Sequence, residues 1–351
     1  MRIGIPRELK PLEGRVGLIP AACGELVRQG HEVFIESSAG EKSGYGDDQY
    51  RELGVTVLDT ADELFERAEM IVKVKEPIAP DLDRLRKDHL LFCYLHLAAE
   101  PELTERLKQI GLTAVAFETV EDKGNLPLLA PMSDIAGRIA IQVATHLLHQ
   151  PEGGKGILLG GVPAAKRGKV VIVGCGMAGG NAAQLAAGIG AEVVVFDKDP
   201  AKLAWARTFG PNVTGLYPHT DDVIDQLRTA DIAVGAVLVA GARAPHVITK
   251  EAVREMQPGS VVVDISVDQG GCVESTRPTT WEDPTYVWEG VTHFTVTNMP
   301  GAVPRTGSQA LSAAIAPYCS RLASGNWRDF DPLIKGINVE NGEVVHPAIK
   351  G

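Results

Sequence analysis

Residues 169–190, KVVIVGCGMAGGNAAQLAAGIG, decide the fold of this chain. An apolar β-strand pattern, KVVIV, leads directly into GCGMAG, and a helix pattern rich in small residues follows at once. In this arrangement Gly174 permits the tight strand-to-helix turn, Gly176 lets the backbone approach a pyrophosphate, and Gly179 lets helix and strand pack closely. The start of the helix offers unpaired N–H groups and a partial positive charge to phosphates. We therefore predict a dinucleotide site at this turn.

An acidic residue at the end of the next predicted strand supports this interpretation. Asp197 ends the run AEVVVFD, about twenty residues beyond the glycines, where a carboxylate is expected to bind ribose hydroxyls. A carboxylate there repels a 2′-phosphate, which favours NAD over NADP, although Lys198 next to it weakens that preference. The alternative is a glycine-rich helix start that serves only packing, with Asp197 as a turn residue.

Strand and helix patterns alternate on both sides of this stretch, which predicts an α/β fold with mainly parallel sheets. Before it, the predicted strands are Arg2–Pro6, Glu32–Glu36, Val55–Leu58, Met70–Lys75, Leu90–His96 and Thr113–Glu118, and the predicted helices include Ala21–Gln29, Glu102–Ile110 and Ser133–Leu148. The second series has five predicted strands, Lys169–Gly174, Glu192–Asp197, Ile232–Val237, Ser260–Ile265 and His293–Thr297. Five strands with helices between them describe a doubly wound sheet.

The nucleotide-type sheet occupies the middle of the chain, which predicts two domains. We expect a discontinuous substrate domain, residues 1–127 plus 304–351, and an NAD-binding domain, residues 128–303. A helix pattern over Ser308–Ser320 joins the end of the chain to the first domain, and a polar segment follows it. A cleft between the two domains is the expected ligand site.

Composition excludes several classes of function. The 351 residues carry a formal net charge of −11 and have no basic run, which argues against binding to nucleic acid or to an anionic membrane. The N-terminus lacks a signal-peptide pattern, and no apolar run has the length of a membrane span. The five cysteines are scattered and form no CxxC pair, which indicates a reducing compartment and no structural metal site. We expect a cytoplasmic protein.

Three basic residues are candidates for chemistry because of their placement. Lys75 ends a predicted strand before Pro77, His96 ends another, and Arg15 lies in the loop after the first strand. Ligands bind beyond the carboxyl ends of parallel strands, so the three side chains can converge on one pocket. Arg15 suits a substrate carboxylate, Lys75 suits a polarised carbonyl or imine, and His96 suits proton transfer.

Each candidate also has an ordinary structural explanation. An arginine in a polar loop is usually solvated, and a histidine among apolar residues is often a hydrogen-bonded core residue. A lysine at a strand end is a common edge-protecting charge, and Lys73 is such a case in our interpretation.

A second polar cluster lies in the nucleotide domain. A β-run ends in Asp264, and the loop DQGG begins at Asp268. Asp268 could orient ammonia or water, or hold His96 in one tautomer, and the ordinary alternative is an Asx-turn before glycine. Asn298 leaves a strand at the same sheet edge and could reach the nicotinamide amide or ribose.

These stretches resemble those of alanine dehydrogenases and of the related domain of proton-translocating nicotinamide nucleotide transhydrogenases. The resemblance covers nearly the whole chain. The motifs that carry it are IGIPRELK and EGRVGL near the start, KVKEP around Lys75, YLHLA around His96, LLAPMS ending at Ser133, LLGGVP, the glycine-rich turn with Asp197, DQGGC around Asp268, and NMPGAVPRT at Asn298–Thr306. The family often has GGGVVG where this chain has GCGMAG, so Cys175 and Met177 replace smaller or branched residues.

The resemblance implies two Rossmann-like domains in a homohexamer and the reversible oxidative deamination of L-alanine to pyruvate and ammonium, with NAD as cofactor and no metal. It implies that Arg15 and Lys75 hold the substrate and that His96 and Asp268 are catalytic. The implied cofactor-binding residues are Ser133, Gly174, Gly176, Met177, Ala178, Gly179, Asp197, Lys202, Val237, Leu238, Val267, Asp268, Asn298 and Met299.

Three other functions stay open at this stage. A transhydrogenase domain passes hydride between two nucleotides and needs no amino-acid pocket. A catalytically silent NAD-binding module would leave the three basic residues without a use, although unused converging charges cost desolvation. A dehydrogenase acting on another small amino or keto acid differs from an alanine enzyme by only a few contacts.

Overall fold

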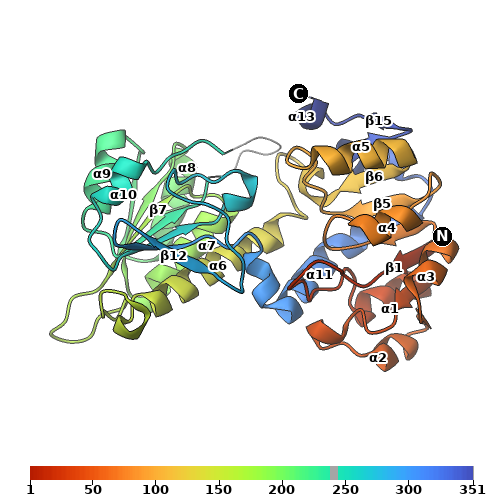
Figure 1. Ribbon diagram of the computed structural model, residues 1–351, viewed down its shortest axis with the longest axis horizontal. Coiled ribbons are helices and arrows are strands. Elements are labelled where there is room, and N and C mark those ends of the chain that lie inside the picture. Colours follow the sequence, from red (N-terminus) through yellow and green to blue (C-terminus); the bar gives the residue numbers. More distant parts are fainter. Residues whose placement is uncertain (238–243, 351) are drawn as a thin grey trace. The chain divides into compact units, whose positions relative to one another are not determined.

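The computed structural model describes residues 1–237 and 244–350, which form two compact units (Figure 1). The first unit comprises Met1–Met132 and Gly301–Gly351, and the second comprises Ser133–Pro300. Each unit contains one sheet in which parallel pairing dominates. The predicted α/β class with two doubly wound sheets is therefore confirmed.

The sheet of the first unit has the strand order β15-β14-β6-β5-β4-β1-β2-β3. Its strands are β1 (Arg2–Ile5), β2 (Glu32–Glu36), β3 (Thr56–Leu58), β4 (Met70–Val72), β5 (Leu90–Cys93), β6 (Thr113–Ala116), β14 (Ile337–Glu340) and β15 (Glu343–Val344). The strands β1 to β6 pair in parallel, whereas β14 pairs antiparallel with β6. The central strands are buried on both faces and read as continuous apolar runs, as parallel strands between helix layers do.

The end of the chain differs from its prediction. The polar segment expected after the last long helix contains β14, whose Ile337, Asn338 and Val339 are buried. The strand pairs with the edge of β6 and so provides hydrogen-bond partners for its backbone; for example, the Ala116 N–H donates to the carbonyl of Gly336. Sequence alone missed it because its alternation is short and because the partner strand lies more than two hundred residues earlier.

Two strands of this sheet are shorter than predicted. The prediction extended β4 to Lys75 and β5 to His96, but the strands end at Val72 and Cys93. Backbone hydrogen bonds still join Lys73 to Phe92 and Tyr94 to Val74. Beyond them, side-chain carboxylates accept from the backbone N–H groups and the ladder ends. Lys75 and His96 therefore lie in loops beyond the strands.

Helices cover the first sheet, and short 3₁₀ helices, labelled η, lie in the loops. The helices are α1 (Pro20–Arg28), α2 (Asp47–Arg51), α3 (Ala61–Arg67), α4 (Ala79–Arg84), α5 (Pro101–Ile110), α11 (Pro304–Ala323), α12 (Asp331–Lys335), α13 (Pro347–Lys350), η1 (Glu41–Ser43), η2 (Phe117–Thr119) and η7 (Trp327–Asp329). Proline begins α1, α5 and α11, where its missing N–H costs nothing.

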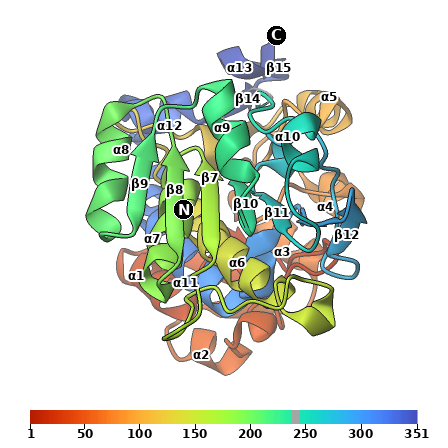
Figure 2. The ribbon, with the colours of Figure 1, turned by 90° about the vertical axis from the view of Figure 1, so that its left-hand side faces the viewer.

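The sheet of the second unit has the order β12-β13-β11-β10-β7-β8-β9, and Figure 2 shows β9, β8, β7, β10 and β11 side by side in that order. Its strands are β7 (Lys169–Val173), β8 (Glu192–Phe196), β9 (Val213–Leu216), β10 (Ile232–Gly235), β11 (Val261–Asp264), β12 (Thr285–Trp288) and β13 (Val291–Phe294). The sequence prediction missed β9 and β12, the two edge strands, because edge strands are only partly buried and their patterns are weak.

The helices of the second unit follow the predicted alternation. They are α6 (Ala130–Leu147), which begins at the end of the first unit, α7 (Met177–Ile189), α8 (Pro200–Ala206), α9 (Thr220–Leu227), α10 (Lys250–Arg254), η3 (Gln150–Glu152), η4 (Arg207–Phe209), η5 (Val267–Gln269) and η6 (Met299–Ala302). Small residues allow close packing between α6 and α7: a Cβ atom on Gly137 would lie 2.1 Å from the carbonyl oxygen of Ala178.

Candidate active site

In the first unit, the polar side chains gather at the carboxyl ends of three neighbouring parallel strands. The loops after β1, β4 and β5 meet there because these strands are adjacent in the sheet. The loop after β1 carries Arg15, the loop after β4 carries Lys75, and the loop after β5 carries His96. Topology therefore places the three predicted substrate and catalytic residues of this unit at one edge.

Arg15 is buried, with 3% of its side chain exposed, and it forms a two-point ion pair with Glu13. Its Nε donates to Glu13 Oε1 over 2.7 Å, and its Nη2 donates to Oε2 over 2.5 Å. Its remaining Nη1 approaches the Met132 sulfur at 2.9 Å, which is a weak acceptor. Glu13 thus fixes the plane of the guanidinium.

Serines of α11 and η1 hold the loop that carries Arg15. Ser308 Oγ accepts from the Val16 N–H at 2.9 Å, and Ser312 Oγ accepts from the Ile19 N–H at 3.1 Å. Ser43 Oγ lies 2.7 Å from Ser308 Oγ and donates to the Gly14 carbonyl over 2.7 Å. The sequence prediction missed this support, because the serines are separated from the loop by as many as 293 positions.

Glu8 shapes the segment that carries Lys75. Its carboxylate accepts from the Val74 N–H at 2.6 Å and from the Lys75 N–H at 3.4 Å. Burial raises the pKa of Glu8, and the charge of Lys73 and these backbone donors only partly offset that. A side-chain carboxylate therefore replaces the neighbouring strand as the acceptor for this backbone.

The interpretation of Lys73 as an edge-protecting charge is wrong. Its side chain is 1% exposed, and its Nζ lies 3.5 Å from Glu8 and 3.1 Å from Asp81. Burial lowers the pKa of Lys73, but the two carboxylates outweigh it and leave the pKa raised. Lys73 is a buried cation that stabilises the base of the Lys75 segment.

His96 adopts a left-handed backbone with φ of 51°, which is uncommon for a residue other than glycine. Its N–H donates to Glu118 Oε1 over 2.6 Å, and the Leu95 N–H points to the same carboxylate at 3.2 Å. Its ring stacks on Tyr94 with centroids 5.8 Å apart. Strained backbone of this kind persists where surrounding contacts over-determine it.

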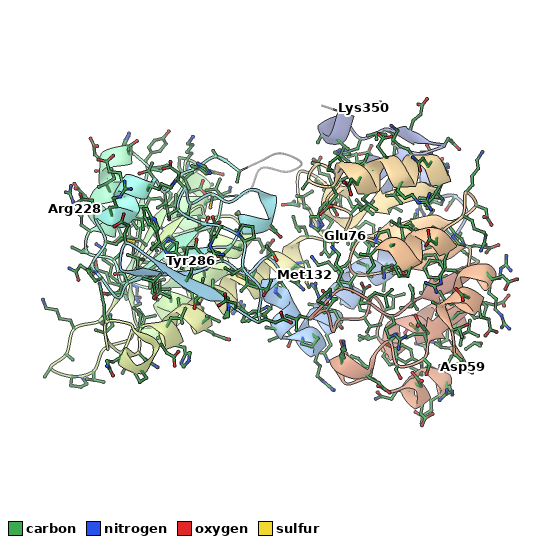
Figure 3. The ribbon with its side chains drawn as sticks, in the orientation of Figure 1. Asp59, Glu76, Met132, Arg228, Tyr286 and Lys350 are labelled. Atoms are coloured by element: carbon green, nitrogen blue, oxygen red, sulfur yellow. The ribbon has the colours of Figure 1, made fainter. Side chains whose placement is uncertain are left out.

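Two carboxylates determine the charge of the His96 ring. Burial alone would lower the pKa of His96, but Glu118 and Glu76 outweigh burial and raise it. Glu76 lies with one oxygen 3.9 Å from His96 Nδ1 and forms an ion pair with Lys10 (Glu76 is labelled in Figure 3). Glu76 directly follows one predicted strand and Glu118 ends another, but no local pattern in the sequence indicated that they contact His96.

The glycines of the second unit have the geometry predicted for a phosphate-binding turn. Gly174 has φ of 101°, and a Cβ on Gly179 would lie 1.8 Å from the Gly174 carbonyl oxygen. At Gly176, the N-cap of α7, a Cβ would meet no described atom within 4 Å apart from its own neighbours in the chain and helix. Two glycines are therefore required for packing, and the third leaves open space in front of the helix, as close approach of a phosphate requires.

Asp197 follows β8 at the same edge as the glycine turn. Its Oδ2 accepts from the Cys175 N–H at 2.7 Å, and its Oδ1 accepts from the Asp199 N–H at 2.9 Å. Lys202 Nζ lies 3.9 Å from Oδ2. These contacts bring Asp197, Lys202 and the glycine turn together, which matches the arrangement expected for a ribose and its pyrophosphate.

The DQGG loop is held by Asp264 at the end of β11. Its Oδ2 accepts from the Cys272 N–H at 3.0 Å and from Thr276 Oγ1 at 2.6 Å. Asp268 lies in η5 and is exposed, so the buried anchor of this loop is Asp264 and not Asp268. Asp268 is thereby presented at the strand-end face.

The other predicted cofactor residues lie on the elements around this edge. Val267 is buried beside Asp268, and Val237 follows β10 and accepts a hydrogen bond from Ser266 through its carbonyl. Leu238 lies outside the described residues. The remaining positions are Met177, 48% exposed, and half-buried Ala178 at the start of α7, half-buried Ser133 in α6, half-buried Asn298 after β13 and buried Met299 in η6.

Two family models match consecutive parts of the chain. Residues 4–136 match the N-terminal domain model of Alanine dehydrogenase/PNT, and residues 140–347 match the C-terminal domain model of the same family. The chain belongs to the alanine dehydrogenase/PNT family. The resemblance expected from the sequence is thereby confirmed.

Individual relatives of this family cover the chain almost completely. An alanine dehydrogenase of Mycolicibacterium smegmatis is 44% identical over 99% of this chain and 96% of its own length. A solved structure of an L-alanine dehydrogenase superposes with a TM-score of 0.95 at 48% identity, covering 100% of this chain and 98% of the other. A transhydrogenase from Sinorhizobium meliloti superposes with a TM-score of 0.85 at 25% identity, covering 99% and 100%. Membership of this family implies a nicotinamide nucleotide as cofactor.

Residues 1–237 and 244–350 contain neither a metal-type cluster of side chains nor a helix suited to a membrane. In this part of the chain, no group of histidine, cysteine and acidic side chains is arranged to hold a metal ion. In the same part, no helix combines the length and apolarity that crossing a membrane requires.

Proposed function

We propose that the protein is an alanine dehydrogenase that oxidatively deaminates L-alanine to pyruvate and ammonium, reversibly, with NAD. The observation that carries the proposal is the group formed by buried Arg15 and half-buried Lys75 and His96 at one edge of the first sheet, in a chain that also has a dinucleotide-type glycine turn. Relatives at about 44% identity that are named alanine dehydrogenase support the substrate.

In this proposal the first unit binds the amino acid. Arg15 receives the substrate carboxylate, which is a stronger acceptor than the Met132 sulfur that Nη1 now contacts. The two bonds to Glu13 keep the guanidinium plane fixed, which reduces the entropy lost when substrate binds. Lys75 polarises the carbonyl or imine carbon–heteroatom bond.

His96 exchanges the proton. In the deamination direction a water adds to the imine, and the unprotonated ring accepts a proton from it; in the reverse direction the protonated ring returns the proton. Burial lowers the pKa of His96, and two carboxylates raise it. Neighbouring groups therefore set this pKa, as is typical of a residue that transfers protons near neutral pH. Asp268 is proposed as the second catalytic residue.

NAD, when bound, accepts the hydride from the α-carbon of the substrate. The open space at Gly176 and the packing of Gly174 and Gly179 fit its pyrophosphate, and Asp197 fits its adenosine ribose and excludes a 2′-phosphate. The residues proposed to hold it are Ser133, Gly174, Gly176, Met177, Ala178, Gly179, Asp197, Lys202, Val237, Leu238, Val267, Asp268, Asn298 and Met299.

The test is the formation of NADH with a panel of amino acids, using the wild type and His96→Ala. We expect turnover with L-alanine and a loss of about two to four orders of magnitude in the variant, the range of general acid–base catalysis. Tight NAD binding without turnover of any amino acid would support a transhydrogenase-like or silent module instead. Turnover of a different amino acid alone would support the closer alternative.

The homohexamer and the cytoplasmic location expected from the sequence belong to the same proposal. Light scattering coupled to size-exclusion chromatography measures the first, because six chains of 37.4 kDa differ clearly from one or two. Fractionation of the source cells measures the second.

A further inference from the structure

One buried carboxylate at the proposed active site has an oxygen without a hydrogen bond. Glu76 has 9% of its side chain exposed, and its Oε1 forms an ion pair with Lys10. Its Oε2 is fully buried and has no hydrogen-bond partner among the described residues. Burying an ionised oxygen without a partner is costly, so such an atom calls for an explanation.

The unbonded oxygen faces His96. Its distance to His96 Nδ1 is 3.9 Å, which is within ion-pair range but too long for a hydrogen bond. Catalytic hydrogen bonds are often long in the free enzyme and shorten when substrate binds. A small rotation of either side chain closes this gap.

The other contacts of His96 fix its position but leave its tautomer open. Glu118 accepts from the His96 backbone N–H, and Tyr94 stacks on the ring face. Neither contact involves a ring nitrogen. Glu76 Oε2, in contrast, lies close enough to His96 Nδ1 to accept a hydrogen bond from it after a small movement.

We propose that Glu76 is the positioning residue of His96: its Oε2 accepts the Nδ1–H, fixes the proton on that nitrogen, and leaves Nε2 to exchange a proton with the substrate. The proposal rests on the acid–base role of His96 proposed above. It also replaces Asp268 as the group that holds the His96 tautomer.

The charges around His96 fix the sign of the expected effects. Glu118 and Glu76 raise the pKa of His96, whereas burial and the charge of Lys75 lower it. Lys10 forms an ion pair with Glu76 and acts on the ring through the charge of that carboxylate. Removing the Glu76 charge therefore lowers the His96 pKa, and removing the Lys10 charge raises it. Tyr94, the other group against the ring, keeps a neutral hydroxyl, because burial raises its pKa.

The experiment measures the pKa of His96 without using catalysis. Diethyl pyrocarbonate modifies only unprotonated imidazole, so the rate of modification of the His96 peptide against pH, followed by mass spectrometry, gives its midpoint. Full-length wild type is compared with Glu76→Gln, Lys10→Met and the surface control Glu105→Gln, whose side chain is 63% exposed. The exposed His149 serves as an internal reference in each sample.

We expect the His96 midpoint to fall by about one pH unit in Glu76→Gln, as loss of an adjacent opposite charge predicts, and to rise in Lys10→Met. The control variant and the His149 midpoint stay unchanged. The low-pH limb of the kcat/KM profile for L-alanine should move with the midpoint, and Glu76→Asp should restore part of the shift. A purely structural role for Glu76 moves none of these pH midpoints.

An unchanged His96 midpoint in a folded Glu76→Gln protein overturns the proposal. A His96 midpoint that falls in Lys10→Met, as it is expected to fall in Glu76→Gln, also overturns it. If Glu76→Gln does not fold, Glu76→Asp and Lys10→Met decide by the sign of their shifts. Failure of the proposed function is distinct, because it shows as absent turnover in the wild type while the modification experiment still reports the midpoint.

Discussion

Replacing Gly176 by alanine separates the binding of a dinucleotide from the packing of the turn. Gly176 is the N-cap of α7 with φ of −77° and ψ of −162°, which any residue adopts. A Cβ there would contact no described atom within 4 Å outside its own chain and helix neighbours. The variant should therefore fold as the wild type does.

The expected change in stability is small. Alanine is a poorer N-cap than glycine by about 0.5–1 kcal/mol. The lower entropy of the unfolded chain returns about 0.4–1 kcal/mol. The two terms nearly cancel, so the free energy of unfolding should change by less than about 1 kcal/mol.

Binding should respond in the opposite way. The added methyl group fills the space in front of the helix where the pyrophosphate must approach the backbone. We expect the Kd for NADH to rise at least about tenfold, or 1.4 kcal/mol, by fluorescence titration or calorimetry.

Gly179→Ala is the matched comparison. Its Cβ would lie 1.8 Å from the Gly174 carbonyl oxygen and 3.1 Å from Ala236 Cβ, so backbone must move. That overpacking should cost about 3 kcal/mol and lower the Tm by about 6–12 °C. Wild-type affinity for NADH in a folded Gly176→Ala protein would refute the phosphate site, and wild-type stability of Gly179→Ala would refute the packing argument.

Three further outcomes are expected. Asp197→Asn should reduce the preference for NAD over NADP at least about tenfold, measured as the ratio of kcat/KM values, because it removes the charge that repels a 2′-phosphate. Ser308→Ala should destabilise the protein by about 1–3 kcal/mol in urea unfolding and raise the KM for pyruvate, because the buried Val16 N–H loses its acceptor. Ser320→Ala on the same helix should change neither, because half-buried Ser320 loses only a solvent-exposed hydrogen bond to Gln29. Burial opposes ionisation of Glu76, but His96, Lys75 and Lys10 outweigh burial and hold the pKa of Glu76 far below 4.5. The ionised carboxylate therefore stabilises the fold above pH 4.5, and this stabilisation is lost as the pH falls below 4.5. Glu76→Gln should lose less stability than wild type between pH 6 and pH 3.5, and equal losses would contradict the argument.

The nucleotide-binding half could be predicted from the sequence because its determinants are local. A buried strand, three glycines and a helix of small residues fall within 22 consecutive positions, and Asp197 ends the next strand. Such a strand–turn–helix unit positions its own phosphate site, so the pattern indicates both the fold and the ligand. The long helices α5, α6 and α11 were also predicted, with differences of a few residues at their ends, because their periodicity is strong.

The sequence also named Arg15, Lys75 and His96, but only as strand-end or loop residues at one predicted edge. What holds them depends on which strands adjoin. Glu8 follows β1 and caps the segment after β4, while Glu118 follows β6 and caps the segment after β5. No spacing rule in the sequence connects these positions.

Tertiary structure alone therefore decided the electrostatics of the proposed site. It buried Lys73 between two carboxylates, placed Glu76 beside His96, and brought the serines of α11 to a loop almost 300 positions earlier. A charged side chain takes its pKa and its orientation from neighbours in space, and burial multiplies their effect by excluding water. Residue types and local patterns are written in the chain, but the partners of each charge exist only once the sheet has formed.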